Sequence, residues 1–530
     1  SQILGLPQSH VTVEIERLGG GFGGKITQNF LVSGLCALAA YVVGRTVKLR
    51  LDIHTTMKML GKRSPYYAEY QVGSDNNGTL AGVVIDMYGD VGWAYTGTES
   101  PLGTREWFDN AYYCPNWLFT PIAVKTNKAV HTACRSPGST PFMFIIESIM
   151  DHLAKSLGLD PLAVRQLNLY TTGQKIPNGM ILNYCNIRQV VASLATDIGL
   201  DQRKAAVNSF NQANRWKKRG IAVMPNRFAI GWSGAQYNTH VIIHHGDGSV
   251  AIAHGGIDMG QGINTKVIQV CAFELGIPIT KIWVKTSSST INANSMTSGG
   301  SITSELCCLG VIEACKTLNQ RMAPVKATMS NPTWEQLVTE CYDQMIDLTA
   351  AYVTHENDPY PAHYSCYSAT CVEAELDVLT GQYQLRQMDM LYDCGDSTNP
   401  ELDIGQAEGG FVMGAGYFLQ EDIQYDPQTG QVINASTWDY KPPLPKDLPM
   451  NFNFKFLRNA PNPSGVLGSK AVGEPPLAMA AVSLFAVKHA VEAARAEIGQ
   501  DYFFPLNAPA TVEQVQSLCL NNITDYTFGK

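Results

Sequence analysis

The sequence predicts a mixed α/β protein of the α+β kind, and three observations support this prediction. Stretches that alternate apolar and polar residues, as strands do, are interspersed along the chain with apolar runs of helical length. Short turns that contain glycine join several strand pairs, which indicates antiparallel hairpins rather than a purely parallel sheet. The chain has 530 residues, enough for two or more domains with cores of their own.

The chain begins with a local unit that combines strands, a glycine loop and a helix. In order, a strand, a glycine-rich loop, a helix and a second strand are predicted at residues 11–17, 19–24, 28–43 and 47–51. The apolar run from Phe30 to Val43 is shorter than the ~20 residues that a bilayer span needs. We therefore expect it to be a buried helix.

Hairpins and longer helices follow. Paired strands on either side of a turn with glycine are predicted at residues 67–72 and 79–88, 241–245 and 250–254, and 371–379 and 383–391. Helices are predicted at residues 142–157, 264–275 and 476–498. Gly158 and Gly276 are placed to end the first two of these helices. A polar stretch at residues 171–177 is the predicted boundary between a first domain, 1–171, and a second, 172–530.

Composition excludes several classes of partner. Only 16% of the residues are charged, the formal net charge is −8, and no basic run is present, so neither nucleic acid nor an anionic membrane is an expected partner. Thirteen cysteines are too sparse for a disulfide scaffold, and none form a Cys-x-x-Cys pair. No signal peptide is recognised, and a reducing compartment, the cytoplasm, is the expected location.

The loop Gly19–Lys25 permits three interpretations when it is taken alone. A phosphate-binding P-loop requires Ser or Thr after the lysine, and Ile26 stands there instead. A dinucleotide site would use the glycines at 19, 21 and 24 with Asp52 as the ribose acceptor, although Asp52 lies further along than the ~20 residues usual for that motif. A glycine-rich turn without a ligand is the third interpretation.

Three further segments have related character. Two more glycine loops, residues 255–262 and 298–301, each precede a helix-like segment, where backbone amides can hold ligand oxygens. Glu474 stands directly before a helix that begins with proline. Taken alone, Glu474 fits an ordinary glutamate at a helix N-terminus, which the helix dipole favours.

Together these segments resemble a known family, the molybdenum hydroxylases, which comprise xanthine dehydrogenases and aldehyde oxidases. The matching segments occur in order at residues 19–25, 134–138, 254–269, 299–303, 403–409 and 469–476. The resemblance covers only the C-terminal, molybdopterin-binding part of such enzymes. It therefore implies [2Fe–2S] and FAD domains upstream in a longer polypeptide, a truncated first domain at Ser1, and a homodimer.

The resemblance also implies a cofactor site where two lobes meet. The backbone of Gly21, Phe22 and Gly23 would lie beside the sulfurated molybdenum, Gln261 would hydrogen-bond its apical oxo group, and Arg135 would lie beneath it. The remaining residues that would hold the pterin and its phosphate are Gly260, Gly300, Ser301, Thr303 and Gln406. The pterin dithiolene holds the metal, so no protein side chain is expected as a metal ligand.

Glu474 matches the position of the family's general base. The resemblance implies that Glu474 takes the proton of a Mo–OH group as its oxygen attacks carbon, while hydride passes to Mo=S. An aldehyde would become a carboxylic acid, and two electrons would pass to the iron–sulfur and flavin domains.

The predicted substrate pocket differs from that of the purine-oxidising branch. Ile26 replaces a purine-gripping glutamate, and Gly103 aligns where that branch has an arginine, although Arg105 is nearby. Pro137 replaces one aromatic ring, as in insect aldehyde oxidases, and Trp232 is the predicted second ring. These differences favour an apolar aldehyde as substrate. A purine hydroxylase, an inactive member of the family and an NAD-linked dehydrogenase remain the alternatives.

Overall fold

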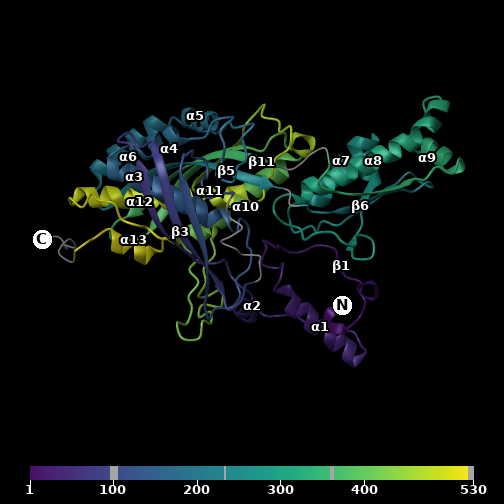
Figure 1. The fold of residues 1–530 in the computed structure, drawn as a ribbon, viewed down its shortest axis with the longest axis horizontal. Helices are drawn as coiled ribbons and strands as arrows, with labels where there is room; N and C mark the ends of the chain where they lie inside the picture. Colours follow the sequence, from purple (N-terminus) through teal and green to yellow (C-terminus); the bar gives the residue numbers. More distant parts are fainter. Residues whose placement is uncertain (96–105, 232–233, 359–362, 523–530) are drawn as a thin grey trace.

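Strands and helices are mixed along the whole chain, which confirms the predicted α/β class. The computed structural model describes residues 1–95, 106–231, 234–358 and 363–522. Within these ranges the strands form two four-stranded sheets, a three-stranded sheet and a two-stranded pair. Figure 1 shows the segment that carries α7, α8 and α9 extending to one side of the molecule, with the N-terminal segment around α1 below it.

The N-terminal segment contains less strand than predicted. Only β1 (Glu14–Ile15) forms, and it pairs with β9 (Ser287–Ser288), which is equally short. The helix α1 (Asn29–Val43) confirms the predicted helix and ends at Gly44 in the left-handed conformation. The strand predicted at residues 47–51 is wrong, because this stretch is irregular and runs directly into α2 (Ile53–Met59).

Asp52 has a structural role that removes the dinucleotide interpretation. Its carboxylate accepts a hydrogen bond from the backbone amide of Thr55 at 2.7 Å and so caps the start of α2. A dinucleotide fold needs an acidic residue at the end of a second strand. Since the strand is missing and the carboxylate is used as a cap, the NAD-linked alternative is wrong.

The prediction that residues 30–43 form a buried helix is also wrong. No residue of α1 is buried, and the exposed fractions of Phe30 and Val42 are 63% and 74%. The helix packs mainly against η1 (Gln2–Leu4), where Ile3 contacts Gly34. An apolar run favours a helix, but contacts from distant parts of the chain decide whether that helix is covered.

A three-stranded sheet and its helices form one core. The predicted hairpin is confirmed by β2 (Tyr66–Ser74) and β3 (Leu80–Gly92), and β4 (Trp117–Lys125) adds parallel to β3. The neighbouring helices are α3 (Ser139–Leu157), α4 (Pro161–Asn168), α5 (Ile187–Asp197) and α6 (Leu200–Ala213). Gly158 ends α3 in the left-handed conformation, as predicted. This core joins residues from both sides of the stretch 171–177, and the predicted domain boundary there stays a prediction.

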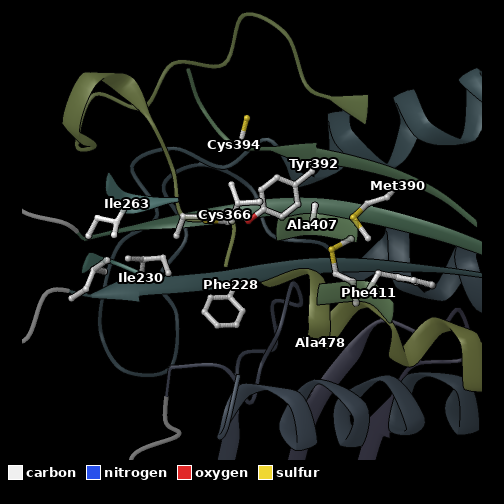
Figure 2. Close-up of a cluster of buried hydrophobic side chains, with 14 of the residues drawn as sticks. Phe228, Ile230, Ile263, Cys366, Met390, Tyr392, Cys394, Ala407, Phe411 and Ala478 are labelled. Carbon is white, nitrogen blue, oxygen red and sulfur yellow. Dashed lines mark hydrogen bonds between the residues drawn. The ribbon is translucent and has the colours of Figure 1, made fainter. Parts of the chain in front are cut away.

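The central sheet has the order β13-β12-β11-β5. Its strands are β5 (Lys217–Gly231), β11 (His363–Asp377), β12 (Tyr383–Asp393) and β13 (Asn451–Phe456), and β11 and β12 confirm the third predicted hairpin. The helices α5 and α6 contact this sheet, and so do α11 (Pro475–Met479) and α12 (Ala481–Glu497), which also pack against α10 (Pro400–Leu419). Figure 2 shows Phe228, Tyr392 and Phe411 among the side chains of the larger core.

The segment Pro475–Glu497 passes a length and hydropathy test for a membrane span, and 83% of the most apolar window is buried inside the protein. Its packing is that of a core helix.

The second four-stranded sheet carries two of the glycine loops. Its strands are β10 (Thr349–Val353), β6 (Asn238–Ile243), β7 (Val250–His254) and β8 (Ile282–Val284), and β6 and β7 form the predicted hairpin. The helices beside it are α7 (Ile263–Leu275), α8 (Thr303–Thr328) and α9 (Trp334–Asp343). Both glycine loops end where a helix begins, residues 255–262 at α7 and residues 298–301 just before α8, as predicted. A short helix, α13 (Val512–Leu518), lies near the C-terminus.

Candidate active site

The glycine loops converge on one cavity of about 600 Å³. Every predicted site residue that the structure describes lines this cavity: Gly21, Phe22, Gly23, Ile26, Arg135, Pro137, Gly260, Gln261, Gly300, Ser301, Thr303, Gln406 and Glu474. Two predicted pocket residues, Gly103 and Trp232, lie outside the described residues. The structure thus brings together residues that are separated by more than 400 positions along the chain.

The backbone around the cavity is suited to an oxygen-rich ligand. A Cβ added at Gly260 or Gly299 would meet no protein atom within 4 Å, so the space beside both backbones is open. Gly300 and Ser301 lead into α8, whose first amides have no acceptor within the helix. Amides at a helix start attract phosphate and similar anions. The residues present therefore fit the pterin and phosphate of a molybdopterin.

The first glycine loop packs tightly against the backbone of residues 133–135. Gly23 has a φ of 97°, and a Cβ there would lie 2.4 Å from the carbonyl oxygen of Ala133. The amide of Arg135 donates to the carbonyl of Phe22, which fixes the two segments against each other. Only glycine fits this approach of backbone to backbone.

Glu474 points at two other segments of the site rather than at its own helix. Its Oε1 accepts from the amide of Ser136 at 3.0 Å, and its Oε2 accepts from the hydroxyl of Ser301 at 2.9 Å. The Ser136 hydroxyl also donates to the Glu474 carbonyl at 2.8 Å. The Glu474 side chain makes no capping bond to α11. Glu474 therefore stands at the N-terminus of α11, but its carboxylate is used to join Ser136 and Ser301 and does not cap the helix.

Arg135 joins three segments beside the cavity. Its Nε donates to the carbonyl of Gly473, and its Nη2 donates to the carbonyl of Gln406 at 2.7 Å. Burial lowers the pKa of the Arg135 guanidinium to about 10, and the nearby Glu474 carboxylate opposes this shift. Arg135 remains a cation at neutral pH and holds the Glu474 segment to α10.

The side chains of Gln261 and Thr303 are both used in hydrogen bonds within the protein. The Gln261 amide nitrogen donates to the carbonyl of Ile257 at 2.8 Å, and its oxygen accepts from the amide of Met259 at 2.6 Å. The Thr303 hydroxyl lies 2.9 Å from the hydroxyl of Tyr237. These bonds fix the segments that line the cavity. The predicted contacts of the Gln261 side chain and of the Thr303 main chain with a cofactor stay predictions.

One wall of the cavity is apolar. Ile26 and Pro137 are among the apolar residues that line the cavity, as predicted, and the apolar lining residues are called the apolar wall below. The structure adds Trp107 and Phe228, whose ring centroids are 5.7 Å apart. Sequence analysis could not identify Phe228 as a cavity residue, because Phe228 lies in a strand whose apolar residues are typical of any core.

The comparisons with known proteins agree with this site. Two family models, both described as a molybdopterin cofactor-binding domain, match residues 1–169 and 193–449. The chain belongs to the molybdopterin-binding domains of the xanthine dehydrogenase and aldehyde oxidase family. Within the described ranges, no group of three or more His, Cys, Asp or Glu side chains could hold a metal ion.

Individual relatives extend the comparison. The xanthine dehydrogenase of Oryza sativa subsp. japonica is 35% identical, and that of Drosophila subobscura is 36% identical, each over 99% of this chain and 40% of that protein. The chain therefore spans about 40% of the length of these relatives. The aldehyde oxidoreductase of Desulfovibrio gigas has the same fold, with a TM-score of 0.83 at 24% identity over 97% of this chain and 55% of that one.

Glu305 is a further carboxylate at the cavity, and sequence analysis did not reveal it. Glu305 in α8 is half-buried, and its two oxygens accept from the amide of Val466 and the hydroxyl of Tyr364, both at 2.9 Å. The Tyr364 hydroxyl in turn accepts from the amide of Ala471. Glu305 thus ties the start of α8 to the segment that leads to Glu474. Burial raises the pKa of Glu305 to about 7.

This shift predicts a stability that depends on pH. A raised carboxyl pKa means that the folded state binds more protons than the unfolded state between the ordinary pKa of about 4.5 and about 7. The free energy of unfolding should therefore fall as pH rises through this window, by up to about 3 kcal/mol. The difference in the free energy of unfolding between pH 5 and pH 7.5, measured by urea unfolding, should be much smaller in Glu305→Gln than in wild type. The control is Glu313→Gln on the same helix, where the carboxylate pairs with Lys316 at 2.8 Å. An unchanged fall in Glu305→Gln would contradict the prediction.

Proposed function

We propose that the chain is the molybdopterin-binding part of an enzyme that oxidises aldehydes to carboxylic acids with water as the oxygen source. The observation that supports this most is the position of Glu474, held at the cavity through both carboxylate oxygens by Ser136 and Ser301. When bound, the molybdenum cofactor supplies the oxygen transfer and takes up the two electrons. For each aldehyde, one water is consumed and two protons and two electrons are released.

In this proposal the residues of the chain bind, orient and move a proton. Glu474 accepts the proton from the attacking oxygen, because a carboxylate held at the cavity is a suitable general base. The two hydrogen bonds to Glu474 fix the direction of the carboxylate before substrate arrives. Arg135 keeps the Glu474 segment in place by holding the carbonyl of Gly473. Gln261 orients the cofactor.

The apolar wall favours an aldehyde with an alkyl or aromatic group. The side chains of this wall include those of Ile26, Pro137, Trp107 and Phe228. Their one hydrogen-bonding group is the indole nitrogen of Trp107, which already donates to the carbonyl of Ala229 and so is not free for a purine. A wall without hydrogen-bonding partners adds little to the binding of the polar atoms of a purine ring. The similarity of residues 135–138 to the corresponding segment of insect aldehyde oxidases also favours an aldehyde as substrate.

A purine hydroxylase is the second candidate. Relatives at 35% and 36% identity are named xanthine dehydrogenase. Glu106 also lines the cavity and is a polar group that a purine could use. The two candidates share the cofactor and the general base and differ only in the substrate wall.

The rest of the proposed enzyme lies outside this chain. Electrons would pass to [2Fe–2S] clusters and FAD on other domains of a longer polypeptide, since the chain spans about 40% of the length of its relatives. A homodimer and a cytoplasmic location complete the proposal.

Substrate preference tests the proposal. The full-length enzyme should have a kcat/KM for medium-length aliphatic or aromatic aldehydes that exceeds the value for xanthine by at least roughly two orders of magnitude. Ile26→Glu should narrow that ratio by adding a hydrogen-bonding group to the wall. Steady-state kinetics on both substrates measures the ratio. Equal or faster turnover of xanthine would favour the purine hydroxylase, and no turnover by molybdenum-loaded protein would indicate an inactive member of the family.

A further inference from the structure

A fully buried ion pair lies behind the apolar wall of the cavity. The guanidinium of Arg227 in β5 contacts the carboxylate of Asp109 at 2.6 Å, and neither residue is exposed to solvent. The other Asp109 oxygen accepts from the hydroxyl of Tyr170 at 2.7 Å. Burying two charges costs several kcal/mol per ion unless their hydrogen bonds are well satisfied. Replacing a buried ion pair by hydrophobic residues of similar size often leaves a protein equally stable. A contribution to folding stability alone therefore does not explain why this pair is present.

Arg227 does more than neutralise Asp109, because it also holds the neighbouring backbone. Its Nε donates to the carbonyl of Asn110 at 2.7 Å, and its Nη2 donates to the carbonyl of Glu106 at 3.0 Å. Its backbone amide donates to the side-chain oxygen of Asn110 at 3.0 Å. One side chain therefore fixes both ends of residues 106–110. A lysine has the charge but lacks the fork of donors that these contacts use.

Asn110 is held from further directions. Its φ is 44°, in the left-handed region that a residue other than glycine adopts only when its surroundings favour it. Its side-chain nitrogen donates to Glu147 at 2.8 Å and to the carbonyl of Pro225 at 3.0 Å. The turn at residues 106–110 is thus fixed to β5 and to α3.

The segment that is held in this way forms part of the cavity wall. Glu106 and Trp107 line the cavity, and so does Phe228, the residue after Arg227. The indole nitrogen of Trp107 donates to the carbonyl of Ala229 at 3.1 Å. Arg227, Asp109 and Asn110 do not themselves line the cavity. An effect of the pair on substrate is therefore indirect and acts through neighbouring residues that line the cavity, such as Glu106, Trp107 and Phe228.

We propose that Arg227 is a positioning residue that sets the substrate-side wall, by holding residues 106–110 so that Trp107 packs against Phe228. The positioning role of Arg227 rests on the proposed function, because it requires that a substrate binds in the cavity. The pair does not contact the glycine loops or Glu474, so it should influence substrate binding more than the chemical step or cofactor retention.

The test uses full-length, molybdenum-loaded enzyme with Arg227→Lys, which keeps a charge for Asp109. Arg219→Lys is the matched control. Arg219 also lies in β5 and forms an ion pair of 2.9 Å with Glu375, but it does not line the cavity. We expect Arg227→Lys to raise KM at least roughly tenfold while kcat changes less than about threefold, since misplacing a wall by a small distance weakens binding. Molybdenum content should be unchanged. The control should match wild type.

Hydrogen exchange supplies a readout that does not depend on activity. Amides of residues 106–112 should exchange at least roughly tenfold faster in Arg227→Lys than in wild type, and at the wild-type rate in Arg219→Lys. Asp109→Asn, which keeps the shape of the side chain, should show the same two effects if Arg227→Lys fails to fold. Faster exchange with an unchanged KM overturns the proposal, as does an unchanged exchange rate. If wild-type enzyme oxidises neither aldehyde nor xanthine, the proposed function fails, and exchange together with the Kd of a bound aldehyde or xanthine decides the positioning role.

Discussion

The Glu474→Gln variant of the full-length enzyme should turn over substrate at least roughly 10²–10⁴-fold more slowly than wild type, the usual loss when a general base is removed. Glutamine keeps the size of the side chain and can still accept one hydrogen bond, from the amide of Ser136 or the hydroxyl of Ser301. It cannot accept the proton of the attacking oxygen. Molybdenum content per protein should be unchanged, and single-turnover reduction by substrate measures the rate.

A matched control separates this effect from a general disturbance of the site. Glu408 is a half-buried glutamate in α10 that does not line the cavity, so Glu408→Gln should retain nearly the full rate. A residue that only capped a helix would cost about 0.5–2 kcal/mol of stability and leave the rate per bound cofactor nearly intact. Reduction of Glu474→Gln at close to the wild-type rate, with cofactor bound, would show that Glu474 is not the base.

Local chemistry explains which parts of the fold the sequence could predict. Gly158 and Gly276 end their helices in the left-handed conformation, which follows from the freedom of glycine at a helix C-terminus. The hairpins formed for an equally local reason, since a short turn with glycine brings its own flanking strands together. The errors lie where partners are distant. The exposed helix α1 and the missing strand at 47–51 depend on which other segments cover or pair with them.

The candidate site likewise has features that the sequence predicts and features that depend on contacts between distant residues. Its glycine loops and Glu474 could be recognised because each segment has a pattern of its own, and the structure brings them to one cavity. The hydroxyl that holds Glu474 belongs to Ser301, 173 positions away, and no local pattern connects the two. Glu305 and Val466 are likewise 161 positions apart. Such contacts become visible only once the chain is folded.

The close approach of the first glycine loop to residues 133–135 predicts a large effect for a single methyl group. In Gly23→Ala the new Cβ would lie 2.4 Å from the carbonyl oxygen of Ala133 and 2.8 Å from its carbon. Both are backbone atoms, so relief requires a movement of the segment that carries Arg135. The φ of 97° adds strain for any residue with a Cβ. We expect a loss of about 1–3 kcal/mol in the free energy of unfolding and at least roughly tenfold less bound molybdenum.

Gly24→Ala makes this prediction specific to the contact at Gly23. The φ of Gly24 is not in the left-handed region, and its added Cβ would lie 3.9 Å from the nearest atom, the carbonyl oxygen of Gly21, an ordinary van der Waals separation. A methyl group there should change the free energy of unfolding by less than about 0.5 kcal/mol and leave molybdenum content unchanged. Elemental analysis of purified full-length protein and thermal unfolding measure both quantities. If Gly23→Ala bound molybdenum and unfolded as Gly24→Ala does, the backbone approach at Gly23 would not shape the cofactor site, and the fit of the first glycine loop to molybdopterin would have to rest on its remaining residues.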